Sequence, residues 1–316
     1  MGKYILKRLL YAVLTILFLI AITFLMMQLL PGDPFVGDKA VDPLVLESLN
    51  AKYGLDKSVP EQFVRYMINV LQGDLGTDLQ TKRPITQTIM ESFPYSFELG
   101  LRALIFAAIM GVLLGVVAAV RHETAWDTLT MLIALIGISV PSFIMGALLQ
   151  YFLGLKLFQW TGVRIFPIMG WNTAASKLLP SFALSFGSMA SISRIMRTSM
   201  MDVMSSDYIK TAKAKGLSRA KIVLKHAVRN AILPVVTLLG PQAAALLTGA
   251  FVVENIFSIP GMGRYFVIGV QSNNYPMIAG TTLFYGAFLV VANLVVDLLY
   301  GVIDPRVKLV GGKDGD

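Results

Sequence analysis

Cysteine is absent from the 316 residues, which excludes disulfides, thiolate catalysis and cysteine-ligated metal sites. The two histidines, His122 and His226, lie far apart, which argues against a histidine-rich metal site. Charge is scarce as well, because charged residues make up 15% of the chain, against roughly 25% in typical soluble domains. Apolar residues make up 55%, and the mean hydropathy is +0.68. This balance excludes an ordinary soluble enzyme and predicts an integral membrane protein.

Motifs for catalysis and nucleotide binding are also missing. The sequence has no Gly-x-x-x-x-Gly-Lys-Ser/Thr P-loop, no His-Glu-x-x-His motif and no Gly-x-Ser-x-Gly motif. We therefore expect no catalytic residue, no metal and no cofactor, so the chain is not expected to be an enzyme. If the protein does work that consumes energy, another chain has to bind the ATP.

Long uncharged stretches are what the sequence has instead. A helix of about 20 apolar residues crosses a bilayer core. We predict an all-α polytopic membrane fold with six transmembrane helices, at residues 9–30, 103–120, 128–155, 178–193, 231–253 and 277–300. Three regions follow from this: a tail and first helix at 1–30, an external loop subdomain at 31–97, and the other five helices at 98–316. One helix is expected within residues 53–70 of the external loop.

Basic residues give the orientation of these helices. The loop at 205–230 has one acid, Asp207, and seven basic residues between the fourth and fifth helices: Lys210, Lys213, Lys215, Arg219, Lys221, Lys225 and Arg229. Because basic loops stay in the cytoplasm, we place this loop and both termini there and residues 31–97 outside. The net charge of +8 is explained in the same way.

The same loop is predicted to form a compact knob of two short helices. Residues 207–216 read as one helix, with Asp207 near its N-terminus and Gly216 as a left-handed C-terminal cap. Ser218 can cap a second helix, whose apolar stripe consists of Ala220, Val223, Leu224, Ala227 and Val228. Three binding modes compete for this knob. It can rest on anionic lipid headgroups, bind nucleic acid, or dock a cytoplasmic partner; nucleic acid is disfavoured because interleaved aromatic residues are missing.

Acidic residues near the predicted spans are candidates for a transport pathway. Asp297 is expected to lie inside the last span with Asn293 on the same face, either as a pathway or gate residue or as a hydrogen-bonded structural carboxylate. Glu254 lies near the outer end of the bundle. After it come Pro260, Gly261, Met262 and Gly263, which are expected to form a non-helical external gate because glycine adopts backbone shapes that other residues avoid.

Small residues recur at helical spacing in two of the spans. Gly111, Gly115 and Ala119 are four residues apart in the second span, and Ala183, Gly187 and Ser191 are four apart in the fourth. Such stripes let helix backbones approach closely. They indicate close packing inside one bundle or, alternatively, a dimer interface.

Residues 207–234 resemble the cytoplasmic loop signature of the membrane subunits of ATP-binding cassette importers. Ala212, Gly216, Leu233 and Pro234 match the general pattern, and the remaining residues are similar to the peptide-importing branch. Other matches to that branch are Leu30-Pro31-Gly32-Asp33-Pro34, Gly73-Asp74-Leu75-Gly76, the segment 257–263 and Asp297-Leu298-Leu299-Tyr300. Three further matches look most like oligopeptide permeases, with dipeptide permeases next: Ser92-Phe93-Pro94, Trp126-Asp127 and Val140-Pro141-Ser142-Phe143.

The resemblance implies the permease subunit of a peptide importer in the cell membrane of a prokaryote. Its partners would be a second homologous permease subunit, two cytoplasmic ATP-binding subunits and an external peptide-binding protein, with surrounding lipid and no nucleic acid. The knob would contact the ATPases through Asp207, Tyr208, Ala212, Ala214, Gly216 and Leu217. Ala212 is small, as a helix seated in a partner's groove requires where the two surfaces meet.

Two other classes of protein stay open at this point. One is an ion- or proton-coupled secondary transporter with Asp297 or Glu254 as the proton site, although no internal inverted repeat is evident. The other is a membrane receptor or anchoring subunit that transports nothing. Partner ATPases would support the importer, and transport by the chain alone on an ion gradient would support the secondary transporter.

Overall fold

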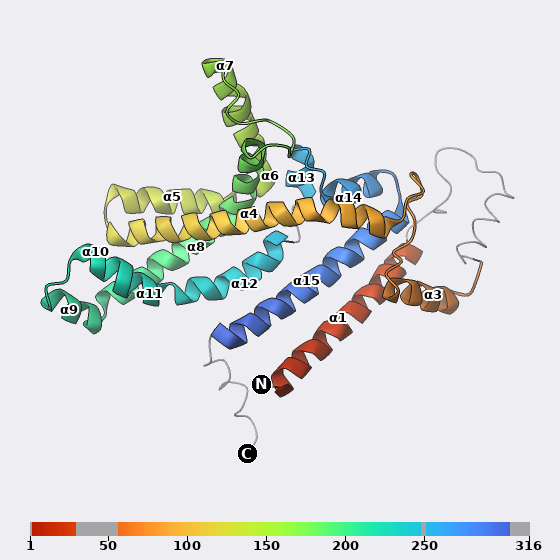
Figure 1. Ribbon diagram of the computed structural model, residues 1–316, viewed down its shortest axis with the longest axis horizontal. Helices are drawn as coiled ribbons and strands as arrows, with labels where there is room; N and C mark the ends of the chain where they lie inside the picture. The colour runs from red at the N-terminus through yellow and green to blue at the C-terminus, as the bar shows by residue number, and fades with distance from the viewer. Residues whose placement is uncertain (1, 30–55, 248–250, 304–316) are drawn as a thin grey trace. The chain divides into compact units, whose positions relative to one another are not determined.

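A computed structural model describes residues 2–29, 56–247 and 251–303, and these are mostly helical (Figure 1). The elements are α1 (Gly2–Leu29), α3 (Val59–Leu71), α4 (Ile85–Val120), α5 (Ala125–Ser139), α6 (Ser142–Leu149), η1 (Gln150–Lys156), α7 (Leu157–Thr161), η2 (Ala175–Lys177), α8 (Leu178–Ser205), α9 (Asp207–Ala214), α10 (Arg219–Lys221), η3 (Ile222–Ala227), α11 (Val228–Ala231), α12 (Leu233–Leu247), α13 (Phe251–Ile256), α14 (Met262–Gln271) and α15 (Tyr275–Ile303). The all-α prediction is confirmed over these ranges. The helix expected within residues 53–70 is α3.

Four of the described helical segments are long and apolar enough to cross a membrane: Leu6–Met26, Ile85–Val120, Ser142–Thr161 and Tyr275–Val296. A fifth is obtained if Arg219–Ala231 and Leu233–Leu247, which are bent by 51°, count as one broken span. The count of six stays a prediction. Helix α5 is apolar but has only 15 residues, and α8 carries serines and arginines along its length.

The predicted third span, at 128–155, is two helices and not one. Helix α5 ends at Ser139, Val140 is extended with φ −93° and ψ 120°, and α6 begins at Ser142. Pro141 explains the break, because a proline forces the residue before it out of the helical region.

The chain forms two compact units, and the first contains Met1–Tyr95 and Pro260–Leu298. Within it, α1 packs on α3, with the ring of Phe24 5.4 Å from that of Phe63 and 5.8 Å from that of Tyr66. The turn between α14 and α15 is tied to the loop before α4, because Asn274 Nδ2 donates to Asp78 Oδ1 at 2.7 Å. Burial raises the pKa of Asp78, but hydrogen bonds from Thr81, the Gln80 amide and Asn274 outweigh it and hold that pKa below its usual range.

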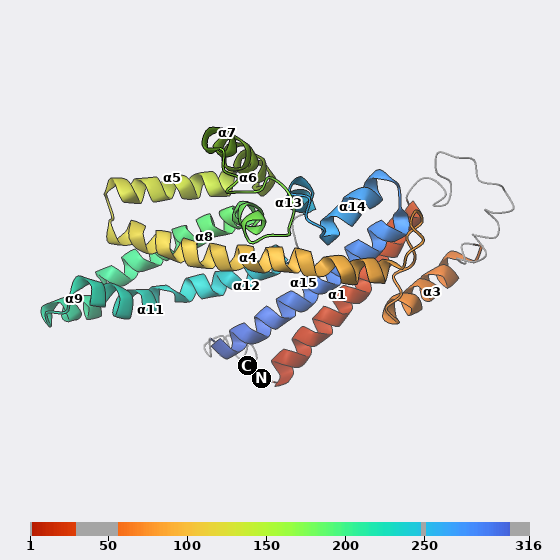
Figure 2. The same cartoon turned by 45° about the horizontal axis from the view of Figure 1, so that its top comes forward.

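The second unit contains Ser96–Ile259 and Leu299–Asp316, and α8 is its central helix. Helices α5 and α8 pack against each other and run antiparallel, since Asp127 meets Arg197 and Gly137 approaches Ala190. Figures 1 and 2 show both helices, with α4 crossing between them in these views. Glycines let both α4 and α5 approach α8 closely. A Cβ on Gly115 of α4 would lie 2.6 Å from the Met196 Cβ of α8, and a Cβ on Gly137 of α5 would lie 2.7 Å from the Ala190 Cβ of α8. Gly111 and Gly115 therefore pack within one chain, as the first reading of the stripes predicted.

Candidate functional site

The knob, residues 207–231, follows α8 after one extended residue, Ser206, and consists of α9, α10, η3 and α11 (Figures 1 and 2). Gly216 ends α9 with φ +76°, which confirms the predicted left-handed cap. The Gly216 amide donates to the Lys213 carbonyl at 2.9 Å and the Leu217 amide to the Ala212 carbonyl at 3.3 Å, the bond pair of a Schellman cap. Ser218 occupies the predicted N-cap position, but its side chain makes no capping bond.

The predicted apolar stripe of the second helix is only partly correct. Val223 and Ala227 are buried together with Ile222, whereas Leu224 is 71% exposed and Ala220 is also exposed. The physical reason is that residues 222–227 form a π-helical turn, η3. In a π-helix residue i bonds residue i+5, so Ile222 and Ala227 share a face and Leu224 is turned outward.

The knob has a core of its own, which continues into α8. Ile209 is fully buried and Ala212 is 7% exposed, and both belong to one apolar cluster with Met196 and Met200 of α8. Ala212 is therefore packed inside this chain, and its contact with a partner stays a prediction. Its small side chain lets α9 pack closely on the rest of the knob.

The other face of α9 is exposed. Asp207, Tyr208, Lys210, Thr211, Lys213 and Ala214 all lie on it or beside it. Tyr208 is 43% exposed, and its hydroxyl accepts a hydrogen bond from Asn230 Nδ2 at 2.7 Å. Of the predicted contact residues, Asp207, Tyr208, Ala214 and Gly216 are accessible, Leu217 is half-buried and Ala212 is not accessible.

Two polar contacts attach the knob and α8 to the turn between α4 and α5. Arg197 of α8 donates to Asp127 of α5 through Nε at 2.6 Å and through a terminal nitrogen at 2.7 Å, and the Asp127 side chain is only 8% exposed. Arg219 of the knob donates to the carbonyl of Val120, the last residue of α4, at 2.7 Å. His122 Nδ1 lies 3.5 Å from the same Asp127 carboxylate.

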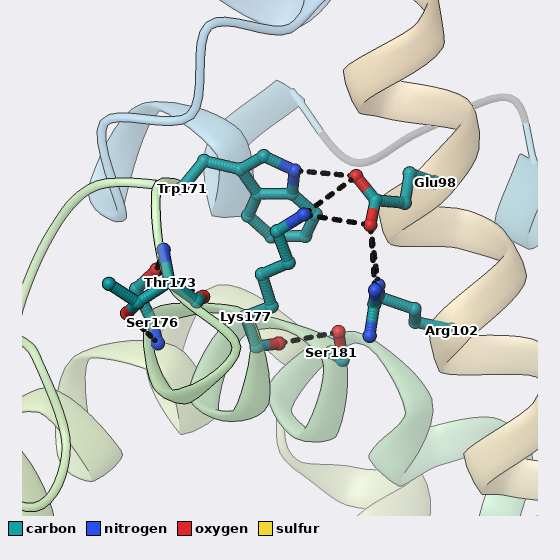
Figure 3. A network of polar contacts seen from close by, with 7 residues as sticks. All are labelled: Glu98, Arg102, Trp171, Thr173, Ser176, Lys177 and Ser181. Carbon is teal, nitrogen blue, oxygen red and sulfur yellow. Dashed lines mark hydrogen bonds and ion pairs between the residues drawn. The ribbon is translucent and has the colours of Figure 1, made fainter.

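A second charged network lies at the opposite end of α8 (Figure 3). The Glu98 carboxylate of α4 accepts hydrogen bonds from Trp171 Nε1 at 2.9 Å, Lys177 Nζ at 2.9 Å and Arg102 Nε at 2.8 Å. It ties the segment before α8 to α4. Ion pairs thus hold the start of α8, at Lys177, and its C-terminal half, at Arg197, to neighbouring helices.

Sequence reasoning missed these two networks as sites. Their members are segments far apart in the chain, so no local spacing reveals the pairing. One signal was available, because Glu98, Arg102 and Arg197 are charges at the edges of apolar stretches, where an unpaired charge is costly.

The predicted external gate is a short break between α13 and α14. Gly261 has φ −87° and caps α14, while Met262 and Gly263 are buried and already helical. The expectation that these glycines supply unusual backbone shapes is wrong, since the residue with positive φ is Ser258, at +52°. Two hydrogen bonds anchor the segment before the break: Gln150 Nε2 donates to the Ile256 carbonyl at 3.0 Å, and the Gly170 amide donates to the Phe257 carbonyl at 2.8 Å.

The pathway candidates lie in different environments. Glu254 is fully buried in α13, and its backbone carbonyl accepts from the Ile259 amide at 2.8 Å. Asn293 is exposed on α15. Asp297 lies in the same helix, but its side chain falls outside the described residues, as do residues 30–55 of the predicted external loop.

Comparison with known proteins gives two matches that together span nearly the whole chain. Residues 111–309 match the family described as "Binding-protein-dependent transport system inner membrane component", and residues 1–100 match the N-terminal region of such membrane components. The dipeptide transport system permease protein DppB of Bacillus subtilis is 43% identical over 98% of this chain and 99% of that protein. The oligopeptide transport system permease proteins OppB of Haemophilus influenzae and Escherichia coli K12 are each 39% identical over 98% of this chain and their full length.

Proposed function

Since this chain belongs to the family of binding-protein-dependent transport system inner membrane components, we propose that it is the permease subunit of an ATP-driven peptide importer. One observation carries the proposal: identity of 43% and 39% extends over nearly the whole chain to permeases of dipeptide and of oligopeptide transport systems. The apolar segments of α1, α4 and α15 agree with a multi-pass membrane protein.

The chain works with partners in this proposal. A second homologous permease completes the translocation pathway, two cytoplasmic subunits hydrolyse ATP, and an external binding protein delivers the peptide. The direct test is reconstitution of the chain with and without these partners in liposomes, with uptake of labelled peptide as the readout. Uptake that depends on ATP and on all partners supports the importer. Uptake by the chain alone on an ion gradient would instead indicate a secondary transporter.

The substrate is proposed to be an oligopeptide rather than a dipeptide. The support is sequence likeness at Ser92-Phe93-Pro94 and Val140-Pro141-Ser142-Phe143. Competition experiments with unlabelled peptides of two to five residues measure the preferred length. Inhibition by dipeptides only would overturn the oligopeptide assignment and leave the importer assignment intact.

The exposed face of α9 is proposed as the contact with the ATPases. Its support is geometric, because Tyr208 and Ala214 are accessible while Ile209 and Ala212 hold the knob together from inside. A knob that only rests on lipid would respond to charge, at about 1 kcal/mol per basic residue near an anionic surface. If α9 instead docks on a protein partner, peptide uptake should depend on the shape of its exposed face.

These two readings are separated by variants on the same helix. Ala214→Trp adds bulk to the exposed face without changing charge, and it should abolish ATPase co-purification and peptide uptake. The double variant Lys213→Gln and Lys215→Gln removes two charges and should have the smaller effect. Membrane levels are matched by immunoblot. Silent Ala214→Trp together with a severe lysine variant would establish the lipid contact instead.

The proposed orientation has both termini and the knob in the cytoplasm of a prokaryotic cell. Because the chain has no cysteine, single cysteines can be introduced without removing native ones. Gln72→Cys and Ser218→Cys replace exposed residues on opposite sides in this proposal. An impermeant thiol reagent applied to intact cells should label the first and not the second, and the reverse pattern would invert the topology.

Pro260, Gly261, Met262 and Gly263 are proposed as part of the external gate, with Asn293 and Asp297 along the pathway. The support is the anchored helix break before α14 and the exposed position of Asn293. Gly261→Val should slow uptake with intact assembly, because its branched side chain crowds the break. Ser258→Gly is the control, since glycine tolerates the positive φ there and uptake should be unchanged. Normal uptake in both variants would remove the gate assignment.

A further inference from the structure

Asp127 of α5 and Arg197 of α8 form a largely buried ion pair with two hydrogen bonds between the carboxylate and the guanidinium group. Both guanidinium contacts are short, at 2.6 and 2.7 Å, and the side chains are 8% and 21% exposed. Buried ion pairs add little stability compared with apolar residues of the same size, because removing two charges from water is costly. A bidentate arginine–carboxylate pair does fix the relative position of two helices.

The pair lies where movement of the knob has to reach the membrane helices. Helix α8 carries Arg197 and ends at Ser205, and a single extended residue, Ser206 with φ −70° and ψ 155°, joins it to α9. Asp127 is at the start of α5, directly after the turn that follows α4. Arg219, on the far side of the knob, reaches the carbonyl at the end of α4.

Small residues make a second part of the contact between α5 and α8. Gly137 approaches Ala190 there, and the Gly137 carbonyl lies 3.4 Å from where a Cβ on Gly187 would be. Small residues let the two backbones come close, but they offer no directional bond. The carboxylate and guanidinium provide the direction.

We propose that Asp127 and Arg197 form a positioning joint that carries movement of the knob from α8 to the helix pair α4–α5, so that ATP hydrolysis is tied to peptide passage. This inference rests on the proposed importer function. The two residues touch neither ATP nor peptide, and they act by holding α5 in register with α8. A joint of this kind predicts a specific defect: hydrolysis that continues without transport.

The experiment uses the complete transporter in liposomes, with partner permease, ATPases and binding protein. Labelled peptide is added to the solution outside the liposomes. ATP hydrolysis and peptide uptake are measured on the same preparation, and the readout is ATP hydrolysed per peptide imported. The wild-type complex has to show peptide-dependent hydrolysis and uptake. Absence of both in the wild type contradicts the proposed function itself, whereas the joint is tested only by the variants.

Three variants define the joint. Asp127→Leu with Arg197→Met replaces the pair by apolar residues of similar size, which keeps assembly but should raise the ATP-to-peptide ratio about fivefold or more. Arg197→Lys keeps the charge without the two parallel bonds and should give an intermediate ratio. Exchange of the two residues, Asp127→Arg with Arg197→Asp, should restore the ratio to within about twofold of wild type by reforming the pair.

The control is an ion pair of the same chemistry that is not part of the joint. Arg83 and Glu91 are in contact at 2.9 Å, with side chains 46% and 53% exposed. Changing both to alanine should leave the ratio unchanged. The joint is overturned if the apolar double variant keeps the wild-type ratio. It is also overturned if the apolar double variant raises the ratio but the exchanged pair gives no recovery of it at matched levels of assembled complex.

Discussion

Gly115 gives the sharpest test of how α4 packs on α8. A Cβ at this position would lie 2.6 Å from the Met196 Cβ, 2.6 Å from the Ser193 carbonyl oxygen and 3.0 Å from the Arg197 amide nitrogen. Ordinary contacts begin near 3.4 Å, so Gly115→Ala is about 0.8 Å too close to two atoms. Because two of the three atoms belong to the backbone, no side-chain rotation relieves the clash, and the helices have to separate.

The cost can be set against a matched substitution in the same bundle. Overpacking costs about 1–3 kcal/mol, while alanine gains about 1 kcal/mol over glycine in a helix. With an overpacking cost at the top of this range, Gly115→Ala should lower the free energy of unfolding by roughly 2 kcal/mol. At Gly187 the nearest atom to a new Cβ is a carbonyl oxygen at 3.4 Å, so Gly187→Ala should keep the gain. The two variants should therefore differ by about 3 kcal/mol.

The assay is thermal unfolding of the purified full-length chain in detergent, followed by fluorescence-detected gel filtration after heating. At roughly 2–4 °C per kcal/mol, the two alanine variants should differ by about 6–12 °C in apparent Tm, with Gly115→Ala below wild type. Membrane levels should follow the same order. If Gly115→Ala is as stable as Gly187→Ala, the close packing of α4 on α8 is refuted.

Three further outcomes are expected. Asp78→Ala should speed protease cleavage within residues 74–84, because it leaves Asn274 and two amides without their acceptor, a loss of about 1–3 kcal/mol; Gln80→Ala keeps its backbone donor and should cleave like wild type. Because the folded state lowers the pKa of Asp78, the ionised carboxylate contributes its full stability above the ordinary carboxyl pKa, and this stability is lost as the pH falls through the lowered pKa. The wild-type segment should therefore become protease-sensitive below about pH 4, and Asp78→Ala should show no such step. Gly216→Val should reduce peptide uptake, whereas Gly216→Asn, which tolerates φ +76°, should stay near wild type; equal uptake by the two variants would contradict the need for a left-handed cap.

Local features of the fold could be predicted from the sequence. Gly216 follows a run of helix-forming residues and ends α9 as expected, and the uncharged run after Lys7 and Arg8 forms α1. Pro141 lies in the middle of the span predicted at 128–155. Proline splits that span because the residue before it leaves the helical region, a local rule that was available from the sequence.

Other features depend on contacts that a single sequence does not contain. Leu224 looked like a core residue because helical spacing of 3.6 puts it beside Val223 and Ala227, but the π-turn of η3 changes that spacing. Ala212 looked like a contact residue because it is small, and burial against Ile209 shows a different reason for its size. For Ala212 the residue type indicates the right constraint, a small side chain, and only the structure shows which contact imposes it.

The partners of the charged residues could not be predicted from the sequence. Asp297 and Glu254 are single charges near apolar runs, which made them candidates. Two of the described ion pairs instead join residues far apart in the sequence, Glu98 with Lys177 and Asp127 with Arg197. In both pairs one member lies in α8 or directly before it. One residue, Ser206, joins α8 to the knob, so a displacement of α9 acts on a helix that glycines of α4 and α5 approach closely and that carries ion pairs at Lys177 and Arg197. In the proposed importer, a helix held in this way would pass a push on the knob to the helices packed against it.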